Sequence, residues 1–427
     1  MRKSINQSFL AIVNVALLAS LFLGCGKNDE PATQGSTVTD TRQLVLDGSH
    51  VLSKAQQTTM TNQNNEFAFR LFEAVSLSPS LKGKSVAVSP VSVTFALGMV
   101  ANGGNEQTVS EITHVLGFGS AEGHRGLNDL NAFCLSQIQQ AGTIDPSVTL
   151  HYANAVCLQE SHGIYPPFEQ AMNCYYQADI FPLDYTKEEA FLALNDWASQ
   201  KTEGMIDPLF EKPYPPIQDG VLMNAIYLKA PWNTPFNKEK TVEADFTREN
   251  GTTTKVPLMV RTDTLRYVST ELFSAVRLYY GQKRFSFTLL LPNEGHTVAE
   301  VAGSLDMETW NQTIASMRKT TMQCSIPRFS TAEEIDLAKI LSDMGAPTMF
   351  TYASLPYLLD HGKSTYVDDV FQKVRIDVDE AGTEGAAVTV VSLGRGGFVR
   401  LSADHPFVYV ISDDVTDTIY FIGTYMG

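Results

Sequence analysis

Small residues and one arginine make up the stretch with the most distinctive chemistry. Residues 380–393 are rich in glycine, alanine, threonine and valine, and Arg395 lies among glycines at 394, 396 and 397. With the two-residue period of a strand, one face carries only uncharged side chains, Thr383, Gly385, Ala387, Thr389, Val391 and Leu393. Glycine weakens a strand and favours a loop. The stretch can therefore serve as an exposed, cleavable loop or as a strand with one buried face, and an ordinary hairpin strand is the simpler alternative.

No motif predicts an enzyme, cofactor or metal centre. G-x-S-x-G and H-E-x-x-H are absent, and neither the cysteines nor the eight histidines cluster at ligand spacing. The glycines around Arg395 could form an anion-binding nest, but no Lys-Ser/Thr pair and no helix follow them. We interpret the paired carboxylates at 368–369 and 413–414 as solvated faces or turns. The chain is therefore expected not to be an enzyme and to need no cofactor and no metal.

The charge balance limits the partners of the chain. Lysine and arginine total 31 against 47 aspartates and glutamates, a formal net charge of −16. This excess argues against nucleic acid and anionic lipid surfaces as partners. A hydrophobic content of 44% is enough for a large core. We expect a monomer.

The amino terminus predicts export. Arg2 and Lys3 precede an apolar run at residues 9–23, which is too short and too early for a membrane-spanning helix and predicts a signal peptide over residues 1–24. Phe-Leu-Gly-Cys at 22–25 resembles a bacterial lipobox, in which Cys25 is lipidated and becomes the first mature residue. A plain secretory signal with a chance cysteine is the alternative. The resemblance implies a lipid anchor in the bacterial outer membrane, and leaves open whether the protein faces the exterior or the periplasm.

A polar segment separates this signal from the folded region. Residues 25–60 are rich in threonine, glutamine, asparagine, serine and aspartate, which predicts a tether with a short ordered start near residues 44–52. A single domain is expected over residues 61–427. The four cysteines within that domain, at 134, 157, 174 and 324, are predicted to be buried free thiols.

Several elements must position the glycine-rich stretch. A short strand ending at Ser89 is followed by Pro90, which suits the first turn of a helix that Ser89 caps. Residues 221–228 form a continuous apolar run, typical of a strand covered on both faces, and Asn224 within it needs a hydrogen-bond partner. We also predict helices at 65–75, 109–116, 168–176, 195–206 and 337–344, and strands at 151–158 and 285–291.

The order and spacing of the motifs resemble the serpin family. Residues 380–387, Glu-x-Gly-Thr-Glu-x-Ala-Ala, resemble the serpin proximal hinge, and residues 405–408 and 419–423 resemble the strands that close the serpin chain. Asn-x-Trp at 195–197, followed by Thr-x-Gly-x-Ile at 202–206, is among the more specific serpin signatures. The resemblance runs from about residue 67 to residue 425.

The resemblance implies a fold and a set of roles. The implied fold is α+β, with a large mixed or antiparallel main sheet, smaller sheets, helices on the outside and an exposed reactive-centre loop at about 380–403. The implied hinge residues are Glu380, Gly382, Thr383, Glu384, Gly385, Ala386 and Ala387, and the implied shutter and breach residues are Ser89, Ser92, Asn224, Trp232 and Gln372. Many serpins carry a histidine where this chain has Gln372. Glutamine can bond to Asn224 or Ser89 but cannot titrate near neutral pH.

The implied activity is suicide-substrate inhibition of a serine protease. In this family the protease cleaves the loop, and the hinge then inserts as a new central strand, which is a form of β-strand addition. Two other functions remain: a non-inhibitory serpin used as a binding protein, and an unrelated surface lipoprotein such as an adhesin or glycan binder.

The cleaved bond has more than one candidate. Counting forward from Glu380 by the commonest serpin loop length places Gly396 before the bond, whereas counting back from Pro406 places Arg395 there. Arginine gains a charge-assisted contact in a trypsin-like pocket, which favours Arg395–Gly396 and a trypsin-like protease. Cleavage after Gly396, before Gly397, and cleavage after Phe398 by a chymotrypsin-like enzyme are the alternatives, and a cysteine protease is the other class of partner.

Overall fold

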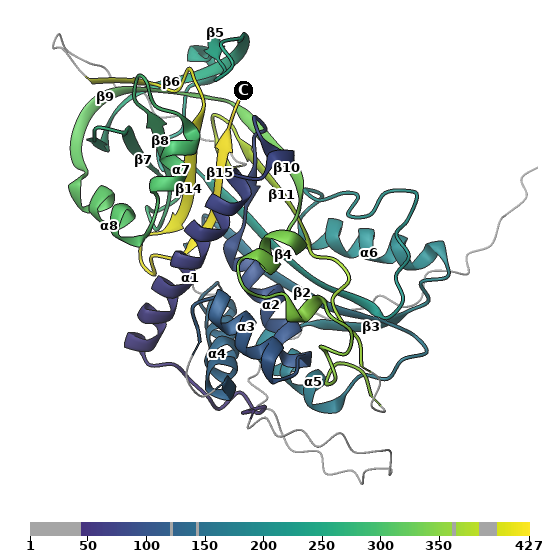
Figure 1. Cartoon of the computed structure of the whole chain (residues 1–427). Helices are drawn as coiled ribbons and strands as arrows, with labels where there is room; N and C mark the ends of the chain where they lie inside the picture. Colours follow the sequence, from purple (N-terminus) through teal and green to yellow (C-terminus); the bar gives the residue numbers. More distant parts are fainter. Residues whose placement is uncertain (1–43, 120–122, 142–144, 361–363, 384–398) are drawn as a thin grey trace, which may run out of the picture. The chain divides into compact units, whose positions relative to one another are not determined.

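Three β-sheets organise the part of the chain that the structure describes (Figure 1). The computed structural model describes residues 44–119, 123–141, 145–360, 364–383 and 399–427, which all lie in one compact unit, residues 35–427. The helices are α1 (Lys54–Ser76), α2 (Pro90–Gly103), α3 (Glu106–Val115), α4 (Gly123–Ala141), α5 (Pro166–Ala171), α6 (Glu188–Lys201), α7 (Val298–Ser304), α8 (Met307–Ser316) and α9 (Ala338–Asp343). None of the helices in these ranges is long and apolar enough to cross a membrane.

The largest sheet contains both closing strands of the chain. Its order is β1-β15-β14-β8-β7-β6-β9-β13, and β5 pairs with β6. These strands are β1 (Ala87–Val88), β5 (Val242–Thr247), β6 (Thr253–Ser269), β7 (Phe273–Tyr279), β8 (Phe285–Pro292), β9 (Arg318–Pro327), β13 (Val399–Ser402), β14 (Phe407–Asp413) and β15 (Ile419–Tyr425). All residues of β14 are buried, as are all of β15 except Tyr425, so the carboxy-terminal hairpin lies in the main core.

Two smaller sheets carry the elements that the resemblance assigned to the hinge and shutter. One has the order β12-β4-β2-β3, formed by β12 (Gly382–Thr383), β4 (Gly220–Pro231), β2 (Thr149–Gln159) and β3 (Asp179–Leu183). The other is the antiparallel pair of β10 (Phe329–Asp336) and β11 (Phe371–Val378). The fold is therefore α+β with a large mixed sheet and smaller sheets, as predicted.

Strand β4 is covered on both faces, as its apolar run predicted. Leu222, Ile226 and Leu228 pack against the main core, which includes buried residues of α2. Met223 belongs to a second cluster that contains Leu194 of α6. The two helices therefore cover opposite faces of this strand (Figure 1).

The predicted tether is wrong for residues 54–60, which are helical. Helix α1 already begins at Lys54, behind a capping box in which Ser53 and Gln56 exchange hydrogen bonds. Leu52 is buried, and the Tyr175 hydroxyl donates to the carbonyl of Val45. The predicted ordered start near residues 44–52 agrees with these contacts. The composition of residues 54–59 did not indicate a helix, because most of them are polar and the buried face of the helix starts only at Met60.

The cysteine prediction holds for three of four positions. Cys134, Cys157 and Cys324 are free and buried, and burial raises the pKa of the Cys324 thiol to about 12, which makes it unreactive. Cys174 is only partly buried, so the prediction of a buried thiol is wrong there. It lies in the π-helical turn Met172–Tyr176 that ends the helix predicted at 168–176.

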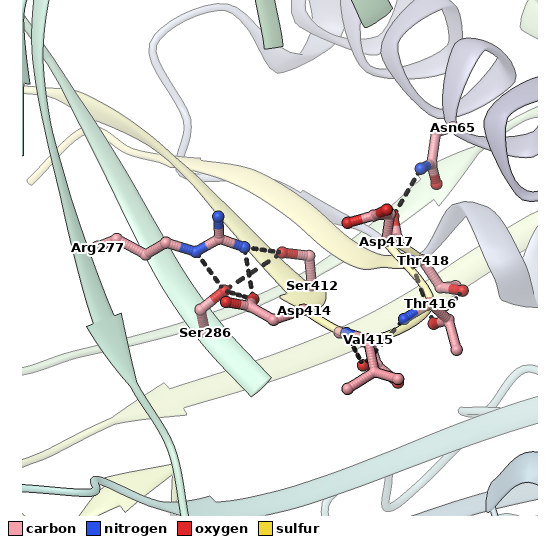
Figure 2. Close-up of polar contacts among 10 residues, drawn as sticks. Asn65, Arg277, Ser286, Ser412, Asp414, Val415, Thr416, Asp417 and Thr418 are labelled. Carbon is pink, nitrogen blue, oxygen red and sulfur yellow. Dashed lines mark hydrogen bonds and ion pairs between the residues drawn. The ribbon is translucent and has the colours of Figure 1, made fainter. Parts of the chain in front are cut away.

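The acidic pairs differ from each other. Asp368 and Asp369 are exposed, as predicted. Asp413 is 1% exposed and accepts hydrogen bonds from Arg284 Nε at 3.0 Å and from the Val415 N–H at 2.7 Å. The interpretation as a turn is therefore right for this pair, because it starts the turn between β14 and β15 (Figure 2), and the interpretation as a solvated face is wrong.

Candidate functional site

A cavity of about 500 Å³ lies between β4 and β11. One edge of β4 pairs with β2 and one edge of β11 pairs with β10, but within the described residues β4 and β11 do not pair with each other. Residues 221–228 and 370–376 line the cavity from its two sides. Unpaired strand edges are templates for a further strand. The cavity is therefore a place where one more strand can bind.

The start of α2 contributes to the wall of the cavity, where Ser89 and Ser92 lie. Ser89 caps the helix, since its hydroxyl accepts from the Ser92 N–H at 3.4 Å. Gln372 clamps the backbone of Ser89: its Nε2 donates to the Ser89 carbonyl at 2.9 Å, and its Oε1 accepts from the Ser89 N–H at 3.0 Å. Of the two partners that the sequence left open for Gln372, Asn224 and Ser89, the structure shows Ser89, and this clamp fastens β11 to the start of α2.

Asn224 has an unused acceptor in the cavity wall. Its Nδ2 donates to Asn154 Oδ1 at 2.8 Å, and Asn154 in turn donates to the Tyr176 carbonyl at 2.6 Å. The Asn224 Oδ1 atom is buried and accepts no hydrogen bond within the described residues. A buried polar atom without a partner costs about 1–3 kcal/mol. A strand that brought a donor to this point would recover that cost.

Trp232 lies just beyond β4, next to the start of the hinge. It follows β4, stacks on Tyr280 with ring centroids 4.4 Å apart, and is 3% exposed. Its backbone N–H donates to the carbonyl of Ala381 at 2.9 Å, and its Nε1 donates to the carbonyl of Asp379 at 2.8 Å. The resemblance predicted Trp232 at the breach, and the structure places it against the first hinge residues.

The short strand β12 pairs with the end of β4, just before the part of β4 that lines the cavity. Gly382 lies opposite Pro231 and Thr383 opposite Ala230, in antiparallel register with β4. Gly382 has φ +144°, and a Cβ there would lie 2.6 Å from the Pro231 Cα. Only glycine fits this close approach. The sequence suggested flexibility as the reason for this glycine, whereas contact with β4 is the stronger reason.

Glu380 is a buried carboxylate beside the hinge. It is 2% exposed, and its Oε1 accepts from the Thr241 hydroxyl at 2.7 Å and lies 3.7 Å from Arg328 NH1. The Glu380 carbonyl also accepts from the Phe236 N–H at 2.8 Å. Sequence reasoning missed Thr241 and Arg328 as partners of Glu380, because neither shows a pattern that points to a residue so distant in the chain.

The remaining predicted site residues lie outside the described residues. They are the hinge positions Glu384, Gly385, Ala386 and Ala387, the reactive-bond candidates Arg395, Gly396, Gly397 and Phe398, and the lipidation candidate Cys25. Among the residues that are described, no group of three or more histidines, cysteines or carboxylates could hold a metal ion.

His405 anchors the chain just after β13, which follows residues 384–398. Its Nδ1 lies 2.9 Å from Asp404 Oδ1 and its Nε2 lies 3.0 Å from the carbonyl of Pro292. Both neighbours are acceptors, so both ring nitrogens donate only when the ring is protonated. The hydrogen bond to Asp404 is the main reason why the pKa of His405 is raised above its ordinary 6.5.

Comparison with known proteins identifies the family that this geometry belongs to. A family model described as serpin (serine protease inhibitor) matches residues 62–427. Iripin-8 of Ixodes ricinus is 30% identical over 376 residues, covering 85% of this chain and 92% of its own length, and Serpin I2 of Homo sapiens is 28% identical over 375 residues, covering 84% and 90%.

Solved structures share the fold. The native state of tengpin, a thermophilic serpin, is 27% identical with a TM-score of 0.75, covering 88% of this chain and 95% of its own. Thyroxine-binding globulin in complex with thyroxine has a TM-score of 0.77 at 22% identity, covering 86% of this chain and 99% of its own.

We predict that His405 makes stability pH-dependent. Because its folded-state pKa is raised, the protonated ring stabilises the fold fully below about pH 6.5, and this contribution is lost as the pH rises through the folded-state pKa. The measurement is the thermal unfolding of wild type and His405→Gln at several pH values from about 5.5 to 8.5. The advantage of the wild type in Tm should be largest at the acid end. A Tm difference that does not change with pH would contradict this role.

Proposed function

The chain belongs to the serpin family, whose members are generally protease inhibitors and not enzymes, and we propose that it inhibits a serine protease by inserting residues 384–393 between β4 and β11. The observation that carries this proposal is the cavity between these two strands, with β12 already paired to β4 next to it. Cleavage of the loop would free its amino-terminal part to continue β12 along the same edge.

The register of β12 fixes what the inserted strand would meet on β4. Thr383 lies opposite Ala230 in an antiparallel pair, so each further residue faces one residue earlier in β4. Six steps along, Thr389 arrives opposite Asn224. The hydroxyl of Thr389 would then donate to the Asn224 Oδ1 atom, which has no partner among the described residues.

The register on β11 brings the same threonine to the clamp. The N–H of Asp379 donates to the carbonyl of Gly382 at 3.0 Å and closes the turn between β11 and β12. If the pairing continues from this bond, the seventh residue before Asp379, Gln372, lies opposite the seventh residue after Gly382, Thr389. The register on β4 and the register on β11 thus bring the same residue, Thr389, to Asn224 on one side and to Gln372 on the other.

The two faces of the inserted strand would suit their surroundings. The uncharged residues Gly385, Ala387 and Val391 fall opposite Leu228, Ile226 and Leu222, which pack against the main core. The outward residue Glu384 falls opposite Lys229, where opposite charges attract. Burial of apolar area and new backbone hydrogen bonds therefore both favour insertion.

The length of β4 supports a large displacement of the protease. In the extended register Leu393 reaches Gly220, the first residue of β4, so the insertion would use the whole strand. Twelve residues of strand from Thr383 to Arg395 span about 40 Å at roughly 3.3 Å per residue. A protease held covalently at Arg395 would end about 40 Å from Thr383, and the family mechanism relies on distortion of its active site before water releases it.

A trypsin-like enzyme is the target that we favour. Arginine before the cleaved bond forms a charge-assisted contact in a primary pocket with a carboxylate, and glycine fills no such pocket. The alternatives after Gly396 and Phe398 remain candidates, as does a cysteine protease.

We further propose that the protein is anchored at a bacterial envelope through Cys25. The support is the charged start at Arg2 and Lys3, the apolar run at residues 9–23 and the lipobox-like sequence at residues 22–25. The polar residues that follow would hold the inhibitor away from the membrane surface.

A serpin-fold binding protein is the second candidate. The cavity between β4 and β11 has a size typical of ligand sites, at about 500 Å³, and a solved structure of this fold is a complex with thyroxine. A binding protein of this kind would form no covalent complex with a protease.

We predict that Thr383→Arg converts the inhibitor into a substrate. Thr383 already pairs with the buried Ala230, so an arginine here would have to bury an unpaired charge, which costs several kcal/mol. Strand β12 could then not start the pairing that the inserted residues 384–393 would continue. The ratio of SDS-stable complex to cleaved, uncomplexed inhibitor should fall on the order of 100-fold, because the protease is released before it is trapped. Both species are measured on the same denaturing gel. Thr383→Val, which has a similar shape and no charge, is the control and should keep trapping. An SDS-stable complex at wild-type yield with Thr383→Arg would refute insertion at this position.

We predict that the protease cuts after Arg395. Mass spectrometry of the carboxy-terminal fragment released on complex formation should find a fragment that starts at Gly396. Arg395→Ala should slow inhibition of trypsin by at least about 100-fold, because the charged contact is lost. A fragment that starts at Gly397 or Val399, or unchanged trypsin inhibition by Arg395→Ala, would place the bond elsewhere.

We predict that Cys25→Ala releases the protein from membranes, because the thioether that carries the lipid cannot form. The measurement is the distribution between membrane and soluble fractions in a bacterial host, with Cys134→Ala as the control that should stay in the membrane. Retention of Cys25→Ala in the membrane fraction would contradict the anchor.

A further inference from the structure

A second cavity, of about 450 Å³, has more basic than acidic residues in its lining. It lies where β6 and β9 meet the end of β7 and the segment after Trp232. Its charged lining residues are Arg261, Asp263, Arg266, Lys283, Lys319 and Asp414. Four of these are basic and two are acidic, in a chain whose net charge is −16. The excess of positive charge here is local.

Arg266 lies in a row of three cations across the sheet. It is directly opposite Arg277 of β7 and directly opposite Lys319 of β9. Cα atoms of opposite residues in antiparallel strands are about 4.5–5.5 Å apart, and like charges in such pairs repel. This row is therefore unfavourable unless counter-charges lie close to it.

The Arg277 end of the row is neutralised within the protein. Figure 2 shows its guanidinium directed at Ser286, Ser412 and Asp414. The Arg277 NH2 lies 2.5 Å from Asp414 Oδ1, and its Nε donates to the Ser286 hydroxyl at 2.8 Å. Ser286 also donates to Asp414 at 2.6 Å. Asp414 is thus bound to Arg277 and Ser286, although it lines the cavity.

The other carboxylate of the cavity is also engaged. Asp263 Oδ2 lies 3.2 Å from Arg261 NH2, and its Oδ1 accepts from the Thr264 N–H at 2.7 Å. Within the described part of the chain, Arg266, Lys283 and Lys319 form no ion pair. Three cations therefore line one cavity without a counter-charge from any described residue.

Arg261 adds a buried donor that has no acceptor. It is 8% exposed, its guanidinium carbon lies 5.1 Å from the centre of the Phe236 ring, and its NH1 donates to the Thr234 carbonyl. Its Nε–H is buried and finds no hydrogen-bond partner within the described residues. A buried N–H on a charged group without an acceptor is costly. An acceptor supplied from the cavity would remove that cost.

We propose that this cavity binds a multivalent oxyanion that carries phosphate or sulfate groups. Guanidinium and ammonium groups form charge-assisted hydrogen bonds to such oxygens. The volume suits a small ligand, and Leu265 and Tyr279 give its walls some apolar surface. Three cations without counter-charges match a ligand with several negative charges better than a single chloride.

A bound oxyanion would link separate elements next to the hinge. Asn233 and Thr234 follow Trp232, which bonds to Ala381, and the Asn233 N–H donates to the Tyr279 carbonyl at 2.8 Å. The ligand would connect this segment to β6 and β9. A ligand that binds only the folded state stabilises it by mass action, so the uncleaved protein should unfold at a higher temperature in its presence.

The test uses the uncleaved full-length protein with two probes, inorganic tripolyphosphate and sucrose octasulfate. Isothermal titration calorimetry and thermal unfolding at low salt should show binding and a raised Tm. Arg266→Gln with Lys319→Gln should weaken binding by at least about tenfold, and added NaCl should weaken it further. Lys54→Gln with Lys82→Gln removes the same charge from exposed positions outside the cavity and should leave affinity within about twofold.

The outcomes separate the source of the ligand from the existence of the site. Binding of tripolyphosphate alone indicates a phosphate ligand, and binding of the octasulfate alone indicates a sulfated one. No binding of either probe up to about 1 mM, or an equal loss in the control pair, would overturn the proposal. Removal of like charges should not lower the Tm of the unliganded protein. If the double variant nevertheless fails to fold, Lys283→Gln, in an exposed loop, carries the same test with an expected loss of at least about threefold.

Discussion

The absence of pairing between β4 and β11 is the feature on which the rest of the structure depends. A sheet edge normally pairs, is covered or is blunted, because its N–H and C=O groups otherwise lack partners. Here two edges face each other across a cavity of about 500 Å³. Among the described residues, hydrogen bonds along these two edges remain unmade, and the Asn224 Oδ1 atom has no donor. One additional strand would satisfy both, and this is the source of free energy for the proposed mechanism.

Two sets of contacts fix the strands on either side of the cavity. Gln372 ties β11 to the backbone of Ser89 through two hydrogen bonds, and Trp232 ties the end of β4 to the carbonyls of Asp379 and Ala381. The Trp232 contacts join β4 only to the turn that follows β11, so the two strands do not pair along the residues that line the cavity. A neutral glutamine at position 372 makes this clamp independent of pH near neutrality.

A second group of charged residues lies in the sheet that contains β6, β7 and β9. Arg277 and Arg284 pair with Asp414 and Asp413 at the end of β14. Arg266 and Lys319, one strand and two strands away from Arg277, have no carboxylate partner among the described residues. Arg277 is thus held in a structural ion pair, whereas Arg266 and Lys319 are the cations that we assign to a ligand. The neighbouring segment after Trp232 places that chemistry beside the hinge.

The sequence by itself determined the helix cap at Ser89 and the burial of β4, because local periodicity and capping chemistry carry these features. It gave the fold class, and picked out Asn224, Trp232, Gln372 and Gly382, through the resemblance to the serpin family. Tertiary structure alone decided that Glu380 meets Thr241 and Arg328, that Asp413 is buried, and that Arg266 lies between two other cations. Those contacts join residues far apart in the chain, and their partners are set by strand register and packing, which no local pattern encodes.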